Sequence, residues 1–113
     1  MTRHASGFKA WILQRISAVY LALFSVYLLF TLILYPPASH EAFKTWILSS
    51  PVLIWLLLFI YLLLLHAWIG IRDVAIDYLW HTGTRVIVLS LVGLMLSACG
   101  LWALVILISA KMI

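Results

Sequence analysis

Residues 52–71 read VLIWLLLFIYLLLLHAWIGI, a continuous apolar stretch that decides the fold of the chain. An α-helix rises about 1.5 Å per residue, so this stretch is long enough to cross the roughly 30 Å hydrocarbon core of a membrane. Pro51 precedes it and suits the first turn of a helix, whereas Arg72 follows it and marks the exit into water. We therefore predict a transmembrane helix that contains one histidine, His66, and no Asp, Glu, Lys or Arg.

Two more apolar stretches, residues 16–35 and 86–110, carry no charged side chain and have the same membrane-spanning length. Pro36 and Pro37 close the first of them, because proline has no backbone N–H to continue a helix. The chain is 67% hydrophobic and 9% charged, too apolar for a small soluble domain, which buries little of its surface. We expect an all-α membrane protein with three transmembrane helices in a single domain, residues 1–113.

Two sequence patterns predict how these helices pack and connect. Ser90, Gly93, Ser97 and Gly100 recur at spacings of three and four, so they share one helical face where another helix can approach closely. Residues 43–48 follow the first span and mix a lysine with aromatic and aliphatic side chains. We expect a packing seam on the third span and a short helix at the membrane surface.

The basic residues are divided unequally between the two sides of the membrane. One side holds Arg3, Lys9, Arg15, Arg72 and Arg85, and the other holds Lys44 and Lys111. Because cytoplasmic segments carry the excess of Lys and Arg, we expect the N-terminus in the cytoplasm and the C-terminus in the periplasm. The net charge of +4 thus reports contact with membrane lipid, and no nucleic-acid partner is expected.

The stretch from His66 to Tyr78 carries most of the side chains capable of chemistry. If the second span stays helical beyond the membrane, His66, Gly70, Asp73 and Asp77 form one stripe by the 3.6-residue period. A histidine inside a membrane is costly, so it usually faces a protein partner and performs a function. One interpretation is a haem ligand beside a glycine that leaves room for a flat ring; the other is a structural histidine bonded to a neighbouring helix.

Haem ligation by two histidines would require a second chain. His66 is the only histidine at membrane depth, because His4, His40 and His81 all lie outside the spans. The second axial ligand must then come from another subunit or a second copy.

Asp77 and Tyr78 lie about 16 Å beyond His66 along a continued helix, near the cytoplasmic headgroups. A tyrosine hydroxyl can donate to a quinone carbonyl, and a neighbouring carboxylate can orient it or relay protons. Alternatively, the aspartates only pair with Arg72 or Arg85 at a solvated helix end. Arg15 lies at the cytoplasmic start of the first span, where it can meet haem propionates or extend to lipid phosphates.

The segment HAWIG at residues 66–70, followed by Asp73 and then Asp77-Tyr78, resembles the signature of the smaller hydrophobic membrane-anchor subunit of bacterial succinate dehydrogenase. ILQRISAV at residues 12–19 resembles the arginine-bearing entry of that family's first helix. The length, the three spans and the short C-terminal tail agree with the family, so the resemblance covers essentially the whole chain.

The resemblance implies that His66 is an axial ligand of a haem b shared with the larger cytochrome b anchor subunit. It implies that Tyr78 and Asp77 contribute to a ubiquinone site beneath the iron-sulfur subunit, and that Arg15 approaches a haem propionate. A flavoprotein subunit would oxidise succinate, linking the tricarboxylic acid cycle to electron transport at a bacterial cell inner membrane. By this resemblance the chain is not an enzyme on its own.

Three other functions stay open. A fumarate reductase-type complex would use the same anchor with electrons running the other way. A small proton-conducting transporter or channel subunit would use His66, Asp73 and Asp77 as a proton path. A structural assembly factor would bind neither haem nor quinone.

Overall fold

The computed structural model describes the backbone of residues 3–112 and the side chains of residues 7–112. Within this range the chain forms four helices: α1 (Arg3–Leu34), α2 (His40–Ile47), α3 (Ser50–Tyr78) and α4 (Thr82–Met112). In the described residues α1, α3 and α4 are long and apolar enough to cross a membrane. The predicted fold class is confirmed. The side chain of Arg3, which contributes to the charge asymmetry, lies outside the described ones.

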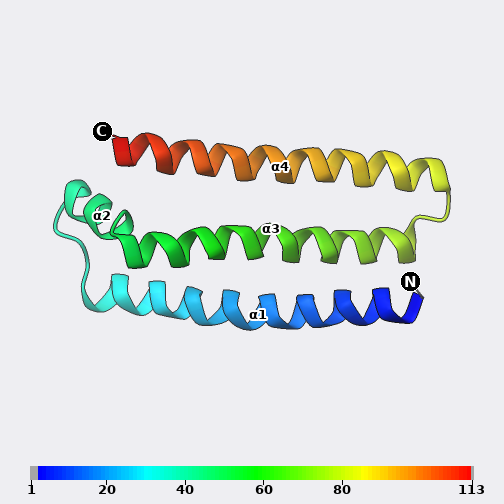
Figure 1. The fold of residues 1–113 in the computed structure, drawn as a ribbon, viewed down its shortest axis with the longest axis horizontal. Helices are drawn as coiled ribbons and strands as arrows, with labels where there is room; N and C mark the ends of the chain where they lie inside the picture. The colour runs from blue at the N-terminus through cyan, green and yellow to red at the C-terminus, as the bar shows by residue number, and fades with distance from the viewer. Residues whose placement is uncertain (1–2, 113) are drawn as a thin grey trace.

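The three long helices run side by side, with α3 between α1 and α4 (Figure 1). The N-terminal end of α1 and the α3–α4 connection lie at one end of the molecule, and α2 and the C-terminus lie at the other (Figure 1). The longest dimension is 52 Å, so the helices extend past a hydrocarbon core of roughly 30 Å. The termini therefore emerge at opposite ends of the bundle.

The sequence accounts for most helix ends. α1 stops at Leu34, just before Pro36 and Pro37. The Oγ of Ser39 accepts a hydrogen bond from the Ala42 backbone N–H at 3.1 Å, which caps the start of α2. α3 begins with a proline in its first turn. The short helix expected at residues 43–48 is thus present as α2, beginning a few residues earlier.

α1 and α3 pack through an aromatic cluster at the end of the bundle near α2. The Phe24 ring lies 5.1 Å from the Phe59 ring and 6.0 Å from the Tyr20 ring, measured between centroids. The hydroxyl of Tyr20 donates to the backbone carbonyl of Trp55 at 2.6 Å. This contact gives the hydroxyl an acceptor in a region where water is scarce.

α4 packs on α3 through small residues, as its sequence predicted. A Cβ added to Gly93 would lie 3.6 Å from the Trp68 ring, and one added to Gly100 would lie 2.7 Å from Leu64 Cδ1. The Gly93 distance is an ordinary van der Waals contact, whereas at Gly100 the end of the Leu64 side chain would have to move. The seam on α4 therefore includes at least these two glycines.

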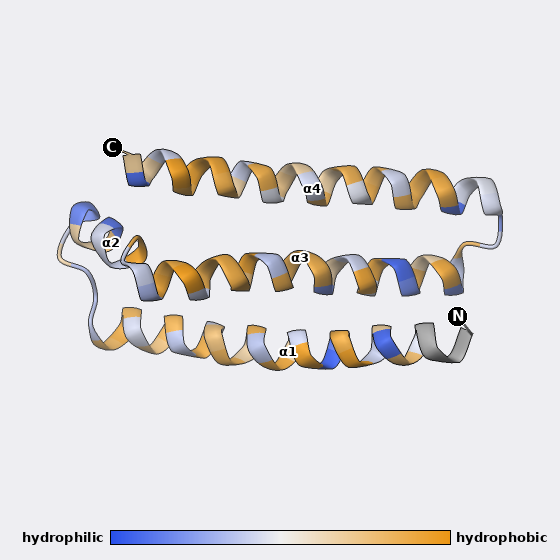
Figure 2. Ribbon diagram, viewed as in Figure 1, coloured by the Kyte–Doolittle hydropathy of each residue, from blue (hydrophilic) through white to orange (hydrophobic). Residues whose placement is uncertain are grey.

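Few described side chains are shielded within the chain. The buried ones are Ser17, Phe24, Ile69 and Ala75. Hydrophobic residues run along the three long helices, and hydrophilic ones gather on α2 and toward the end of the bundle that holds the N-terminus (Figure 2). Many of the large hydrophobic side chains are exposed. The apolar outer surface is suited to lipid or to helices of other subunits.

Candidate functional site

The centre of the candidate site is a hydrogen bond between α1 and α3. His66 Nδ1 on α3 lies 3.0 Å from the Oγ of Ser17 on α1. The Ser17 hydroxyl in turn donates to the backbone carbonyl of Gln14, one turn earlier on α1, at 3.1 Å. Ser17 is 1% exposed, whereas His66 is half-buried. The intramembrane histidine therefore has a polar partner within its own chain, and in the part of the chain that the structure describes only Nδ1 of its two ring nitrogens has a hydrogen-bond partner.

Two neighbouring grooves lie beside this hydrogen bond, and His66 and Gln14 line both. One has a volume of about 440 Å³ and is otherwise lined by Ala67, Gly70, Ile71 and Val74. The other has a volume of about 480 Å³ and is otherwise lined by Gly7, Ala10, Trp11, Arg15, Ala18, Arg72 and Asp73. We refer to this second space as the polar groove. It brings the imidazole of His66 together with two guanidinium groups and one carboxylate.

The charged side chains of the polar groove come from both helices. The guanidinium carbon of Arg15 lies 5.6 Å from the centroid of the Trp11 ring, a cation–π distance. Arg72 Nη2 lies 3.3 Å from Asp73 Oδ1, so the interpretation of Asp73 as an ion-pair partner of Arg72 is confirmed. The groove holds one more cation than it holds carboxylates. It is therefore suited to an anionic group.

Two buried polar atoms near the polar groove have no hydrogen-bond partner among the described residues. They are Gln14 Oε1 and Arg72 Nε. Buried polar atoms are almost always satisfied in native structures, by protein, water or a ligand. These atoms lie near His66 and the two arginines of the polar groove. A polar group from water, a ligand or another chain would complete the site there.

Gly70 faces α1 as well as a groove. A Cβ added at this position would lie 3.3 Å from Gln14 Nε2, closer than most real Cβ contacts. The glycine therefore permits a close approach of α1 and α3 one turn beyond His66. The sequence had suggested room for a flat ligand, and the structure adds a packing role at the same position.

Asp77 and Tyr78 form a separate location at the end of α3. Both side chains are exposed, and Tyr78 is 73% exposed. Because α3 stays helical through Tyr78, the condition for the predicted stripe from His66 to Asp77 is met. The two grooves beside His66 do not include Asp77 or Tyr78 among their described lining residues. The structure thus brings Arg15, His66 and Asp73 together and leaves the Asp77-Tyr78 pair apart.

Arg85 pairs with backbone and with neither of these aspartates. Its Nη2 donates to the carbonyl of Leu79 at 2.8 Å and to that of Ile76 at 3.4 Å. These carbonyls belong to the C-terminal end of α3, where the helix leaves acceptors free. The predicted alternative of an aspartate pair with Arg85 has no such contact in the described part of the chain.

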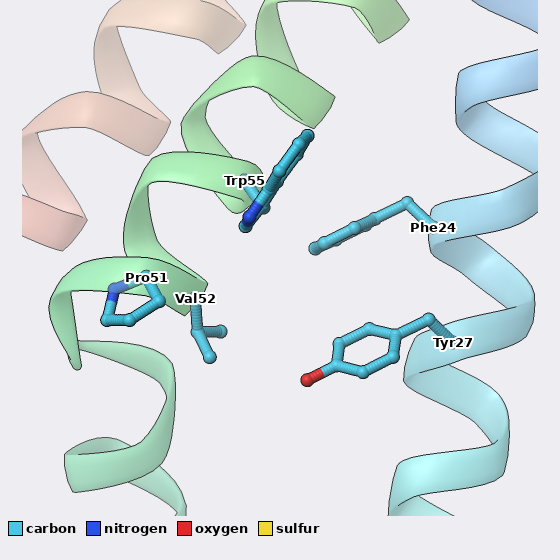
Figure 3. A pocket seen from close by; sticks show the side chains of 5 residues that line it. All are labelled: Phe24, Tyr27, Pro51, Val52 and Trp55. Atoms are coloured by element: carbon cyan, nitrogen blue, oxygen red, sulfur yellow. The ribbon is translucent and has the colours of Figure 1, made fainter.

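Another groove lies at the opposite end of the bundle and is mainly apolar. Phe24 and Tyr27 from α1 face Pro51, Val52 and Trp55 from α3 across a space of about 350 Å³ (Figure 3). It has no histidine or carboxylate among its lining residues. Its side chains are suited to packing and to apolar ligands rather than to proton or electron transfer.

The donor set near His66 does not suit a free metal ion. Within residues 7–112 no group of three or more His, Cys, Asp or Glu side chains could hold one. A haem places a smaller demand on each chain, because its four equatorial ligands come from the ring and each axial position needs one residue. Among the described residues the imidazole has a hydrogen-bond partner only at Nδ1, and the polar groove is lined by two guanidinium groups and one carboxylate, so the site fits this demand.

The sequence interpretation missed Ser17 and Gln14 as members of the site. Both lie three residues apart on one face of α1, inside a segment that otherwise reads as the start of a membrane span. That spacing of two polar residues at the edge of an apolar run was the available signal. Nothing in the sequence indicated which face of α3 would meet them.

Residues 1–108 match the family described as "Succinate dehydrogenase/Fumarate reductase transmembrane subunit". A curated relative from Coxiella burnetii (strain RSA 493 / Nine Mile phase I), named "Succinate dehydrogenase hydrophobic membrane anchor subunit", is 29% identical over 98 residues. The aligned region covers 87% of this chain and 85% of the relative.

Proposed function

The chain belongs to the succinate dehydrogenase/fumarate reductase transmembrane subunit family, and from this premise we propose that it anchors a succinate:quinone oxidoreductase in a bacterial inner membrane. In this role it binds a larger cytochrome b anchor subunit within the membrane, and an iron-sulfur subunit and a flavoprotein subunit at the cytoplasmic end. The three long apolar helices support the anchoring role, and the unequal distribution of basic residues supports the orientation. The name of the Coxiella relative supports the succinate dehydrogenase assignment.

We further propose that His66 provides one axial ligand to a haem b and that the larger anchor subunit provides the other. The observation that carries this proposal is the geometry of His66: it lies between two grooves in a membrane-spanning helix, with Nδ1 held by Ser17 at 3.0 Å. Arg15 and Arg72 would hold the propionates at the cytoplasmic end of the polar groove. When bound, a haem b supplies a one-electron carrier within the membrane.

The proposed quinone site includes Tyr78 and Asp77. Tyr78 is exposed at the end of α3, where its hydroxyl can donate a hydrogen bond to a ubiquinone carbonyl supplied from the membrane. Asp77 is exposed beside it and is placed to orient the tyrosine or to relay protons from the cytoplasm. The remaining walls would come from the other subunits, which explains why these two residues lie outside any described groove of this chain alone.

Replacing Tyr78 with phenylalanine tests this role in the assembled complex. Tyr78→Phe removes one hydrogen-bond donor, so succinate-driven quinone reduction should slow roughly 10-fold, as expected for the loss of about one hydrogen bond. Succinate oxidation with a soluble dye that accepts electrons before the quinone should persist. The exposed Tyr35, at the opposite end of the bundle, provides a matched Tyr→Phe control. Equal loss in both assays, or no loss in either, would contradict the assignment.

The alternative function within the same family, a fumarate reductase-type complex, differs from the proposed one in the direction of electron flow. A fumarate reductase-type complex would use the same helices and the same histidine with a quinol as donor. The Coxiella relative favours the succinate-oxidising direction. The proton-channel interpretation is less favoured, because Asp73 pairs with Arg72 at 3.3 Å rather than standing free along a path.

A further inference from the structure

We infer that Ser17 is a positioning residue for His66: its hydroxyl fixes the tautomer and the ring orientation of the imidazole, and so directs Nε2 to the iron. This inference rests on the proposed role of His66 as a haem ligand and adds a residue of α1 to that site. Ser17 would touch neither haem nor quinone, and its effect would pass through the histidine.

The hydrogen bonds of Ser17 bear on which imidazole nitrogen carries the proton. The Ser17 hydroxyl has one hydrogen, and that hydrogen is donated to the carbonyl of Gln14, which can only accept. The contact of 3.0 Å between Ser17 Oγ and His66 Nδ1 fits either tautomer by distance, and with the Ser17 hydrogen on the Gln14 carbonyl the proposal places the imidazole proton on Nδ1, which donates it to Ser17 Oγ. In the neutral ring Nε2 consequently carries the lone pair. Nε2 is then the nitrogen that can bind a metal.

Burial makes this arrangement stable against water. Ser17 is 1% exposed, so no competing partner from solvent reaches its hydroxyl. In a membrane an unsatisfied polar group costs several kcal/mol, because lipid offers no hydrogen bonds. The hydrogen bond therefore stabilises both the Ser17 hydroxyl and the His66 imidazole. The imidazole is held to one orientation before any haem binds.

The hydrogen bond also affects the electronic character of the ligand. When the ring N–H that does not face the iron donates to an oxygen, the other ring nitrogen of the histidine becomes more basic. A more basic ligand stabilises the ferric state of the haem. Loss of the acceptor should therefore raise the midpoint potential of the haem and weaken its binding. Outer partners of metal-ligating histidines typically contribute roughly 10- to 100-fold to metal affinity.

The test uses the complete complex purified from membranes, with Ser17→Ala as the principal variant. Haem retention against an excess of apomyoglobin should fall roughly 10- to 100-fold, and the midpoint potential should rise. Ser25→Ala is the matched control, because Ser25 lies on the same helix with an exposed side chain. It should behave as wild type in both measurements. Ser17→Cys, with a similar size and a weaker acceptor, should give a smaller shift in the same direction.

The possible outcomes separate this inference from the function on which it rests. An assembled Ser17→Ala or Ser17→Cys complex with wild-type haem retention and potential would overturn the positioning role. A Ser25→Ala complex shifted as far as Ser17→Ala would overturn it as well, since the effect would then be general to α1. A His66→Ala complex measured in parallel addresses the ligand itself. If it kept a wild-type haem spectrum, the haem proposal would fail, whatever Ser17→Ala showed.

Discussion

At the scale of single residues, the site depends on how closely two helices approach. His66 reaches Ser17 only if α1 and α3 stay in contact, and Gly70 permits this contact one turn away. The Gln14 amide occupies the space that a side chain on Gly70 would need. The spacing of histidine and glycine therefore links helix packing to the chemistry proposed for the histidine.

Enlarging Gly70 should disturb the site in proportion to the volume added. Gly70→Ala requires only a small shift of the flexible Gln14 amide and should keep most of the haem. Gly70→Leu overpacks the α1–α3 contact at a cost of about 1 to 3 kcal/mol, and haem content should fall with it. Haem-to-protein ratios of the purified complexes measure the effect. Ala22→Leu is the volume control, since Ala22 is exposed on α1 and lines neither groove beside His66.

The series has a clear contrary result. If Gly70→Leu retained haem as well as Gly70→Ala and Ala22→Leu did, the close approach at Gly70 would not matter for His66. The distance between Ser17 and the imidazole would then have to be maintained by other contacts, such as the aromatic cluster farther along α1 and α3.

The residues of the site were predictable to different degrees. His66 was found because a histidine inside a membrane span is rare and costly. Arg15 was found as a cation at a span entry, and the structure places it in the same groove as His66. Ser17 was not found, because serine is common in membrane helices and its partner lies 49 positions away in sequence. A contact between distant positions depends on the rotation of both helices, which one sequence does not specify.

At the scale of elements, the end of α3 depends on a residue of α4. The guanidinium of Arg85 reaches back to the carbonyls of Leu79 and Ile76 across the short α3–α4 connection. A cation at a helix C-terminus also interacts favourably with the helix dipole. This contact holds the exit of α3, where Asp77 and Tyr78 lie.

Removing this guanidinium should destabilise the end of the bundle that holds the α3–α4 connection. Arg85→Ala leaves carbonyls without their charged donor at a cost of about 1.5 to 3 kcal/mol, so the thermal midpoint of the complex should fall. Arg85→Lys keeps the positive charge with fewer hydrogen-bond donors, so its thermal midpoint should fall less. The measurement is thermal unfolding of the purified complex. Lys111→Ala is the control, because it removes one positive charge from the exposed C-terminal end of α4. If it lowered the thermal midpoint as much as Arg85→Ala does, the role of the Arg85 contacts would be contradicted.

The elements themselves were largely readable from the sequence. Apolar runs of membrane length predicted the three long helices, and the proline pair predicted the end of the first. The helices nevertheless continue past the expected spans: α1 begins at Arg3 and α3 reaches Tyr78. Hydropathy identifies the part of a helix that lies in lipid, whereas backbone hydrogen bonding carries the helix on into water. The polar ends were therefore outside what an apolar pattern could define.

At the scale of the whole molecule, the chain is a three-helix layer with little interior. Only a few described side chains are buried, and the grooves beside His66 open outward. A haem at His66 would have one face against this chain and the other against a second one. The sequence argument that a second histidine must come from another chain stays a prediction. What the sequence could not define is the surface on which that partner lies.

The most direct test of the central proposal is a visible spectrum of the complex purified through a tag on this chain, recorded before and after addition of succinate. We predict that flavoprotein and iron-sulfur subunits co-purify, and that succinate produces the spectrum of a reduced b-type haem. A parallel His66→Ala complex with the same subunits should lose or alter that spectrum. An assembled His66→Ala complex whose haem is reduced by succinate with an unchanged spectrum would contradict the proposal.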